Sequence, residues 1–157
     1  MRKLWILFVL AQCIIFTTVY TTYAEETIQV EMLNKLEKER MVYNPTIVEI
    51  EVGDTVSWIA ESKGHNVQFV TAPNDIKFKS KVSKDVDYTF TESGMYLYVC
   101  TPHKAMGMYG LVIVKKDGLY DLSNLKEIEA SFEKGSKKSK KRLTIMKDNI
   151  YELLEKE

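Results

Sequence analysis

The chain has 157 residues, of which 45% are hydrophobic, so it is long enough to bury the core of one domain. Its 22 basic residues balance its 22 acidic residues at pH 7. This balance gives no global charge excess of the kind that attracts a nucleic acid, and we expect no nucleic-acid partner.

The first 24 residues have the composition of a secretory signal peptide. Arg2 and Lys3 precede a mostly apolar run over residues 4–19, and Thr22 and Ala24 are small residues at the positions that a signal peptidase reads. We therefore predict that residues 1–24 are a signal peptide cleaved after Ala24, which leaves no membrane span. An uncleaved anchor is the alternative, although the polar residues within the segment make it a poor span.

Export makes the cysteine content informative. Cys13 lies in the predicted signal peptide, so the mature chain keeps only Cys100. Cysteines of exported proteins usually pair, and a lone one needs a reason to stay reduced. Metal ligation is such a reason.

From Ile28 onward the sequence shows short strand patterns separated by turn residues. In residues 46–52, Val48, Ile50 and Val52 alternate with two glutamates, as in a strand with one buried face. Further strands are expected at 55–60 (with Trp58 inside), 65–70, 87–91, 95–100 and 111–114. The last is apolar at every position, which predicts a strand covered on both faces. Seven or eight such strands predict an all-β Greek-key sandwich over residues 25–116.

The C-terminal segment has helical spacing instead. Apolar residues recur at 122, 125, 128 and 132, after a possible N-cap at Asp121 or Ser123, and again at 143, 146, 150 and 153. Gly135 and Ser136 separate the two runs. We predict a helical hairpin over residues 120–157 that packs on the sandwich within one domain, residues 25–157. The basic run at 137–142 is interpreted as a solvated helix start rather than a site for an anionic partner.

The strong soft-metal ligands of the mature chain lie in two short strings. His65 stands in Gly-His-Asn at 64–66, and Cys100 and His103 begin the string Cys-Thr-Pro-His-Lys-Ala-Met-Gly-Met at 100–108. Two imidazoles, a thiolate and a weak axial thioether are the ligands of a blue-copper site. The thioether is Met106 or Met108. Structural zinc is the competing interpretation, but it usually takes more thiolates and rarely a methionine.

These ligands predict one type 1 copper ion and a single-electron carrier. The sequence has no Gly-rich phosphate loop and no spare histidine for a catalytic triad or a second copper site, so we expect no enzyme. The alternative function is copper storage or delivery with the same ligands.

The mature chain resembles the pseudoazurins, which are bacterial periplasmic cupredoxins. The resemblance rests on the strings Met-Leu-Asn-Lys at 32–35, Val-Gly-Asp-Thr-Val at 52–56, Lys-Gly-His-Asn-Val at 63–67, Phe-Lys-Ser-Lys at 78–81 and the complete 100–108 string. It implies an eight-stranded cupredoxin barrel in the periplasm with type 1 copper. It also implies electron delivery to respiratory reductases such as copper nitrite reductase.

The resemblance also assigns the ligands. His65, Cys100 and His103 are equatorial, and Met108 is axial because pseudoazurins use the longer cysteine-to-methionine spacing. Asn66 is expected to bind the loop that bears Cys100 and to offer its amide to the sulfur.

A redox partner is expected to dock where His103 reaches the surface. The surrounding apolar patch contains Pro102, Ala105, Met106 and Met41. The nearby lysines that would steer an acidic partner are Lys63, Lys77, Lys79, Lys81 and Lys104. We expect a monomer that docks transiently with a reductase such as copper nitrite reductase and with a cytochrome-type donor.

Overall fold

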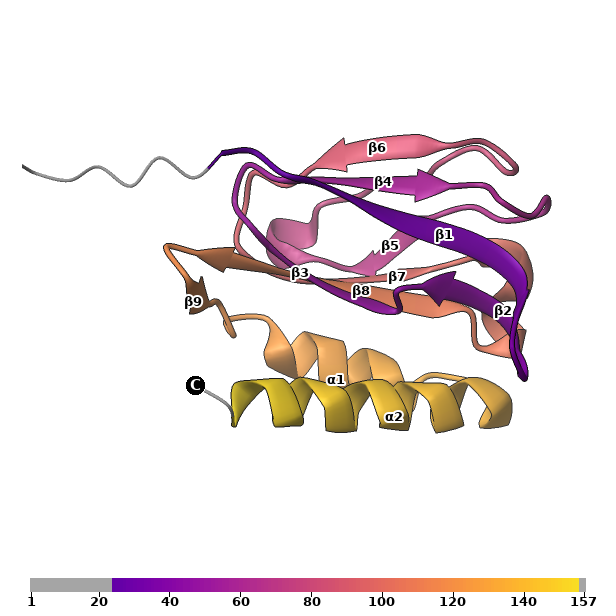
Figure 1. The fold of residues 1–157 in the computed structure, drawn as a ribbon. Helices are drawn as coiled ribbons and strands as arrows, with labels where there is room; N and C mark the ends of the chain where they lie inside the picture. The colour runs from indigo at the N-terminus through magenta and orange to yellow at the C-terminus, as the bar shows by residue number, and fades with distance from the viewer. Residues whose placement is uncertain (1–23, 156–157) are drawn as a thin grey trace, which may run out of the picture.

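The computed structural model describes residues 24–155, so the predicted signal peptide lies outside the described residues. The strands are β1 (Thr27–Leu36), β2 (Glu39–Asn44), β3 (Ile47–Glu51), β4 (Thr55–Ile59), β5 (Gln68–Thr71), β6 (Val86–Thr89), β7 (Gly94–Val99), β8 (Tyr109–Lys116) and β9 (Leu119–Tyr120). The helices are the 3-10 helices η1 (Pro73–Asp75) and η2 (Thr101–Met106) and the α-helices α1 (Leu125–Glu133) and α2 (Lys137–Leu154). Two sheets stack face to face, and α1 and α2 form a third layer (Figure 1). This confirms the predicted sandwich with two C-terminal helices.

The first sheet has the strand order β2-β1-β4-β6. β1 runs parallel to β4, whereas β1 with β2 and β4 with β6 are antiparallel. The period-2 alternation of β1 turns Val30 and Met32 inward, and both are fully buried. Trp58 of β4 is fully buried, as the sequence predicted.

The second sheet has the order β3-β8-β7-β5, with β9 paired to β8. Its two central strands are buried on both faces, which confirms the prediction from the apolar run at 111–114. Val112 and Val114 of β8 belong to the core between the sheets. Leu111 and Ile113 belong to a second core beneath α1 and α2. β7 and β8 are therefore covered by protein on either side.

The two α-helices lie along the outer face of the second sheet (Figure 1). Their buried side chains share the second core with that sheet and are Ile128, Phe132, Leu143, Met146 and Ile150. Ser136 caps α2, because its hydroxyl oxygen accepts from the backbone N–H of Ser139 at 3.3 Å. Among residues 24–155, neither helix combines the length and the hydrophobicity that crossing a membrane requires.

Two local expectations were wrong. Val52 is 40% exposed because β3 ends at Glu51 and the chain turns at Gly53, where φ is +105°. β5 begins at Gln68, so His65 lies in the preceding loop rather than in a strand. The expected number of strands agrees with the structure, which has eight longer strands and the two-residue β9 within residues 24–155.

The predicted N-cap of α1 is also wrong. The cap position is Asn124, whose side chain binds the sheet instead of the helix: Oδ1 accepts from the Met95 N–H at 3.1 Å and Nδ2 donates to the Met95 carbonyl at 2.8 Å. Asp121 accepts from the Ser93 hydroxyl at 2.7 Å and from the Ser123 N–H at 3.0 Å. The sequence pattern marked the right segment but not which polar residue the sheet would bind.

Candidate metal centre

The loop between β7 and β8 carries two of the predicted equatorial ligands and the predicted axial one. Cys100 follows β7 directly, His103 lies within η2, and Met108 immediately precedes β8. The Cys100 N–H donates to the Met108 carbonyl at 3.0 Å, and the Met108 N–H donates to the His103 carbonyl at 3.3 Å. The antiparallel β7–β8 pair therefore holds the two ends of the ligand loop together.

His65 approaches from the loop between β4 and β5. Its carbonyl accepts from the Ser83 N–H at 2.8 Å, and the neighbouring Gly64 N–H donates to the Ser83 hydroxyl at 2.8 Å. Its ring atom Nε2 lies 2.9 Å from Oδ1 of Asn34, a residue near the C-terminal end of β1. Because an amide oxygen only accepts, Nε2 carries the proton and Nδ1 keeps its lone pair. Asn34 lies in the Met-Leu-Asn-Lys string at 32–35, but no local sequence pattern predicts this contact with His65.

The three donor atoms of His65, Cys100 and His103 converge on one point. Nδ1 of His65 lies 3.6 Å from the Cys100 sulfur, and Nδ1 of His103 lies 3.3 Å from it. All three donors lie within 4.8 Å of one another. A first-row metal bonded to nitrogen at about 2.0 Å and to sulfur at about 2.3 Å, near 120°, separates these donors by about 3.7 Å. The donor set and spacing therefore fit one metal ion.

Burial sets the protonation of the site. The side chains of His65 and Cys100 are fully buried, whereas His103 is half-buried. Burial, and then the neighbouring His103, lower the pKa of His65, so that its imidazole stays neutral and able to bind a metal. Burial raises the pKa of the Cys100 thiol, and the backbone N–H groups of Asn66 and His103 partly oppose this. A metal must therefore displace the thiol proton on binding.

Asn66 joins the two ligand-bearing loops. Its Oδ1 accepts from both the backbone N–H and the hydroxyl of Thr101, each at 2.9 Å. This agrees with the expected contact to the loop bearing Cys100. The side-chain Nδ2 donates to the Ser80 carbonyl at 3.5 Å, so the amide that Asn66 offers to the sulfur is its backbone N–H.

The two methionines of the loop differ in burial. Met108 is fully buried and belongs to the same core as Cys100. Met106 is half-buried at the end of η2. The buried residue, held through its backbone to two other ligand candidates, is the better placed of the two to donate a thioether.

Known proteins are similar to this chain in sequence and in fold. The family described as copper binding proteins, plastocyanin/azurin family, matches residues 30–115. The chain belongs to this family. Its cofactor is therefore copper, and the match runs from β1 into β8 and includes the two loops that carry His65, Cys100, His103 and Met108.

Individual members of the plastocyanin/azurin family extend the comparison. Pseudoazurin from Paracoccus pantotrophus is 43% identical over 91 residues, which are 56% of this chain and 63% of that protein, so the match spans less than two thirds of that relative. Among solved structures, pseudoazurin from Methylobacterium extorquens AM1 is 31% identical with a TM-score of 0.67, covering 79% of this chain and 98% of that one. Native pseudoazurin from Hyphomicrobium denitrificans is 35% identical with a TM-score of 0.66, covering 75% and 93%.

Proposed function

We propose that this protein carries single electrons by means of one type 1 copper ion held by His65, Cys100, His103 and Met108. The observation that carries the proposal is the convergence of two imidazole Nδ1 atoms on one buried thiol, at 3.6 and 3.3 Å. Copper, when bound, supplies a Cu(I)/Cu(II) couple that suits this mixture of nitrogen and sulfur ligands. The similarity to pseudoazurins supports the same function.

Three of the four proposed ligands are shielded from solvent, and the fourth is partly exposed. His65, Cys100 and Met108 have no exposed surface, so solvent reaches none of these donors directly. His103 is the one proposed ligand with partial exposure, and the adjacent Pro102 is exposed. The edge of His103 is therefore the shortest route for an electron between the site and a docked partner.

The same burial argues against copper storage or delivery. A delivery protein must hand its ion to another ligand set, which favours exposed and flexible donors. Here the proposed thiolate belongs to the core between the two sheets, which also contains Tyr98 and Val112. Asn34 and Asn66 further restrict the ligand loops through hydrogen bonds. These constraints suit an ion that stays bound while its charge changes.

The visible spectrum of the copper-loaded protein tests the proposal. We expect one Cu(II) per chain and an intense thiolate-to-copper band near ~600 nm. Cys100→Ser should remove the band, because a hydroxyl cannot replace the soft thiolate. Circular dichroism of the same variant, showing an intact sandwich, is the control for folding. A blue Cys100→Ser protein would contradict the proposed ligand set.

We further propose that the protein is exported to the periplasm, where it exchanges electrons with a reductase such as copper nitrite reductase and with a cytochrome-type donor. The predicted signal peptide supports export, and copper ligation would keep the unpaired Cys100 of an exported protein reduced. Intact-mass measurement of the protein from a periplasmic extract should give a chain that starts at Glu25. A full-length chain in the membrane fraction would favour the uncleaved anchor instead.

A further inference from the structure

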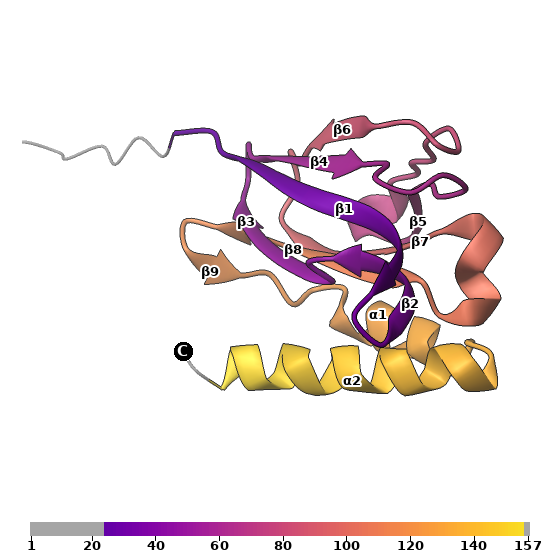
Figure 2. The same cartoon turned by 45° about the vertical axis from the view of Figure 1, so that its right-hand side comes forward.

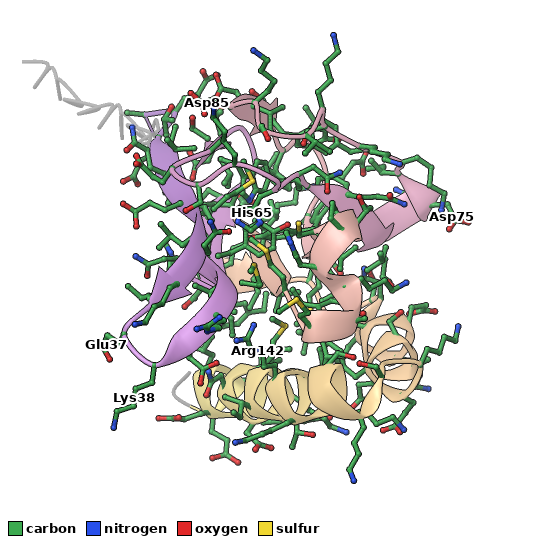
Figure 3. The ribbon with its side chains drawn as sticks, turned by 90° about the vertical axis from the view of Figure 1, so that its right-hand side faces the viewer. Glu37, Lys38, His65, Asp75, Asp85 and Arg142 are labelled. Atoms are coloured by element: carbon green, nitrogen blue, oxygen red, sulfur yellow. The ribbon has the colours of Figure 1, made fainter. Side chains whose placement is uncertain are left out.

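Arg142 of α2 reaches out of the helical layer and binds two other segments, the start of β2 and the ligand loop. Its Nη1 donates to the Gly107 carbonyl at 3.2 Å and to the Met41 carbonyl at 2.7 Å. Its Nη2 donates to the Arg40 carbonyl and to a Glu39 carboxylate oxygen, each at 2.6 Å. Figure 3 shows Arg142 between α2 and the β1–β2 hairpin, whose tip is marked by Glu37 and Lys38.

The Gly107 carbonyl is the contact that concerns the metal centre. Gly107 stands immediately before Met108 and adopts a left-handed conformation, with φ of +85°, at the end of η2. Ser136, the N-cap residue of α2, supports the same stretch, because its hydroxyl donates to the Ala105 carbonyl at 3.0 Å. α2 and its N-cap residue therefore bind two carbonyls of the chain between His103 and Met108. Figure 2 shows η2 at the end of the sandwich near the start of α2.

The strength of these contacts lies in the carbonyls rather than in the ion pair. The Glu39 side chain is 68% exposed, so its pairing with Arg142 is screened by water. The Arg142 side chain is only 22% exposed, and its charged donors face backbone oxygens. One of these oxygens belongs to Met41, which has a positive φ of +53°. The guanidinium thus connects a strained position of β2 to the ligand loop.

We propose that Arg142 is a positioning residue of the metal centre: it fixes the Gly107 end of the ligand loop against the start of β2 and thereby holds Met108 in place. The inference rests on the proposed function. It replaces the interpretation of the basic run at 137–142 as a purely solvated helix start, because the last residue of that run points into the protein. A lysine cannot take its place, since one ammonium group cannot span the carbonyls that the planar guanidinium reaches.

The test compares four variants of the full chain. Arg142→Met keeps the length of the side chain and removes every donor. Glu39→Gln removes only the ion pair and is the matched control for charge. Leu143→Ala opens a cavity in the second core without removing a hydrogen bond to the loop, and is the control for lost stability. Arg142→Lys tests whether charge alone is enough.

Two readouts separate the inference from the proposed function. The first is hydrogen exchange of the Gly107 and Met108 amides in metal-free protein, relative to the Val112 amide within β8. The second is the rate at which the copper-loaded protein loses its blue band to a chelator. Arg142→Met should raise both rates about tenfold or more, as expected for a lost hydrogen bond to a charged group. Arg142→Lys should resemble Arg142→Met, and the two controls should stay within about twofold of wild type.

The following results would overturn the positioning role of Arg142 or the proposed copper site. Relative exchange rates in Arg142→Met that match those of wild type, or that Leu143→Ala reproduces, would overturn the positioning role. An Arg142→Lys protein with wild-type rates would overturn it as well. A wild-type protein with no blue band would refute the proposed copper site, while the exchange data would still decide whether Arg142 fixes the loop.

Discussion

Asn34 illustrates how one side chain determines the state of a ligand. Its Oδ1 accepts from Nε2 of His65, which fixes the ring orientation and leaves Nδ1 directed at the sulfur. Asn34→Ala removes this acceptor, and we expect copper affinity to fall about 10- to 100-fold. Competition with a chromophoric chelator measures the change.

Asn44→Ala is the matched control for that prediction. Asn44 lies in the same sheet and donates to Glu31 at 2.9 Å, with no contact to a proposed ligand. It should leave copper affinity unchanged. Equal losses in the two variants would show that sheet stability, rather than the orientation of His65, controls affinity.

Met108 and Met106 allow a direct test of the axial ligand. Met108→Leu should keep the blue band and raise the reduction potential, because Cu(II) loses a neutral donor that stabilises it. Met106→Leu should change the potential much less, since Met106 is half-buried and outside the core that holds Cys100. Cyclic voltammetry of both variants decides the matter. A larger shift from Met106→Leu would reverse the assignment.

The candidate ligands were predictable, but the residues that orient them were not. Residues 25–157 contain two histidines and one cysteine, so His65, Cys100 and His103 could be chosen from composition and spacing alone. Asn34 lies 31 residues before its partner and Arg142 lies 35 residues after Gly107. No local pattern marks such contacts, because they exist only once β1 and α2 are packed in place.

At the scale of the elements, the carboxylate of Asp121 stabilises the segment between β9 and α1 through two hydrogen bonds. The Ser93 hydroxyl, and then the Ser123 backbone N–H, lower the pKa of Asp121. A folded pKa below the unfolded one stabilises the protein above about pH 4, and this stabilisation is lost as pH falls through the folded pKa. Ser93→Ala should raise the pKa of Asp121 toward its usual value.

An NMR titration of the Asp121 carboxyl measures that pKa. The variant should be less stable than wild type near neutral pH, and the two should become similar in acid, where Asp121 is protonated in both. Ser57→Ala, in β4, is the control and should leave the titration unchanged. An unaltered Asp121 pKa in Ser93→Ala would show that the Ser123 backbone alone sets it.

Strands and helices were easier to predict than their ends. The apolar run at 111–114 identified a strand buried on both faces, and the helical spacing identified α1 and α2. The ends depend on tertiary contacts. Val52 fits the alternation of β3 but is exposed because the turn at Gly53 ends the strand. Asn124 begins α1, but its side chain binds Met95 in the sheet instead of capping the helix.

At the scale of the molecule, the near-neutral net charge conceals local charge. Lys104 lies in η2 beside His103, and Lys79 lies in the loop after η1; both are exposed. If such lysines steer an acidic reductase, electron transfer should slow about tenfold or more from low to high salt. Lys104→Glu combined with Lys79→Glu should slow it at low salt, as stopped-flow kinetics would show.

Lys126→Glu is the matched control for charge. Lys126 lies at the start of α1, which is tied to Met95 at the opposite end of β7 from Cys100. It should leave the low-salt rate nearly unchanged. If the electron-transfer rate changes neither with salt nor in the variant that combines Lys104→Glu with Lys79→Glu, the apolar surface around His103 is the only basis for docking.

The hydrophobic pattern of the sequence predicted the overall architecture but not the strand pairing. Alternation and turn residues predicted a sandwich with a helical hairpin. The parallel pairs β1–β4 and β3–β8 join residues that are far apart in sequence, and hydrophobic pattern says nothing about strand direction. Parallel neighbours of this kind need long connections, and here the connections supply the loops that bear His65 and its supporting residues.

The hydrogen bond from the Cys100 N–H to the Met108 carbonyl has an evolutionary consequence. It joins the two ends of the ligand loop where β7 ends and β8 begins. The next residue pair of the β7–β8 ladder is Val99 opposite Tyr109. Insertions or deletions between residues 101 and 107 would leave that ladder and both cores intact. Descendants of such a chain can therefore explore new loop lengths, and with them new redox properties, without having to invent a new fold.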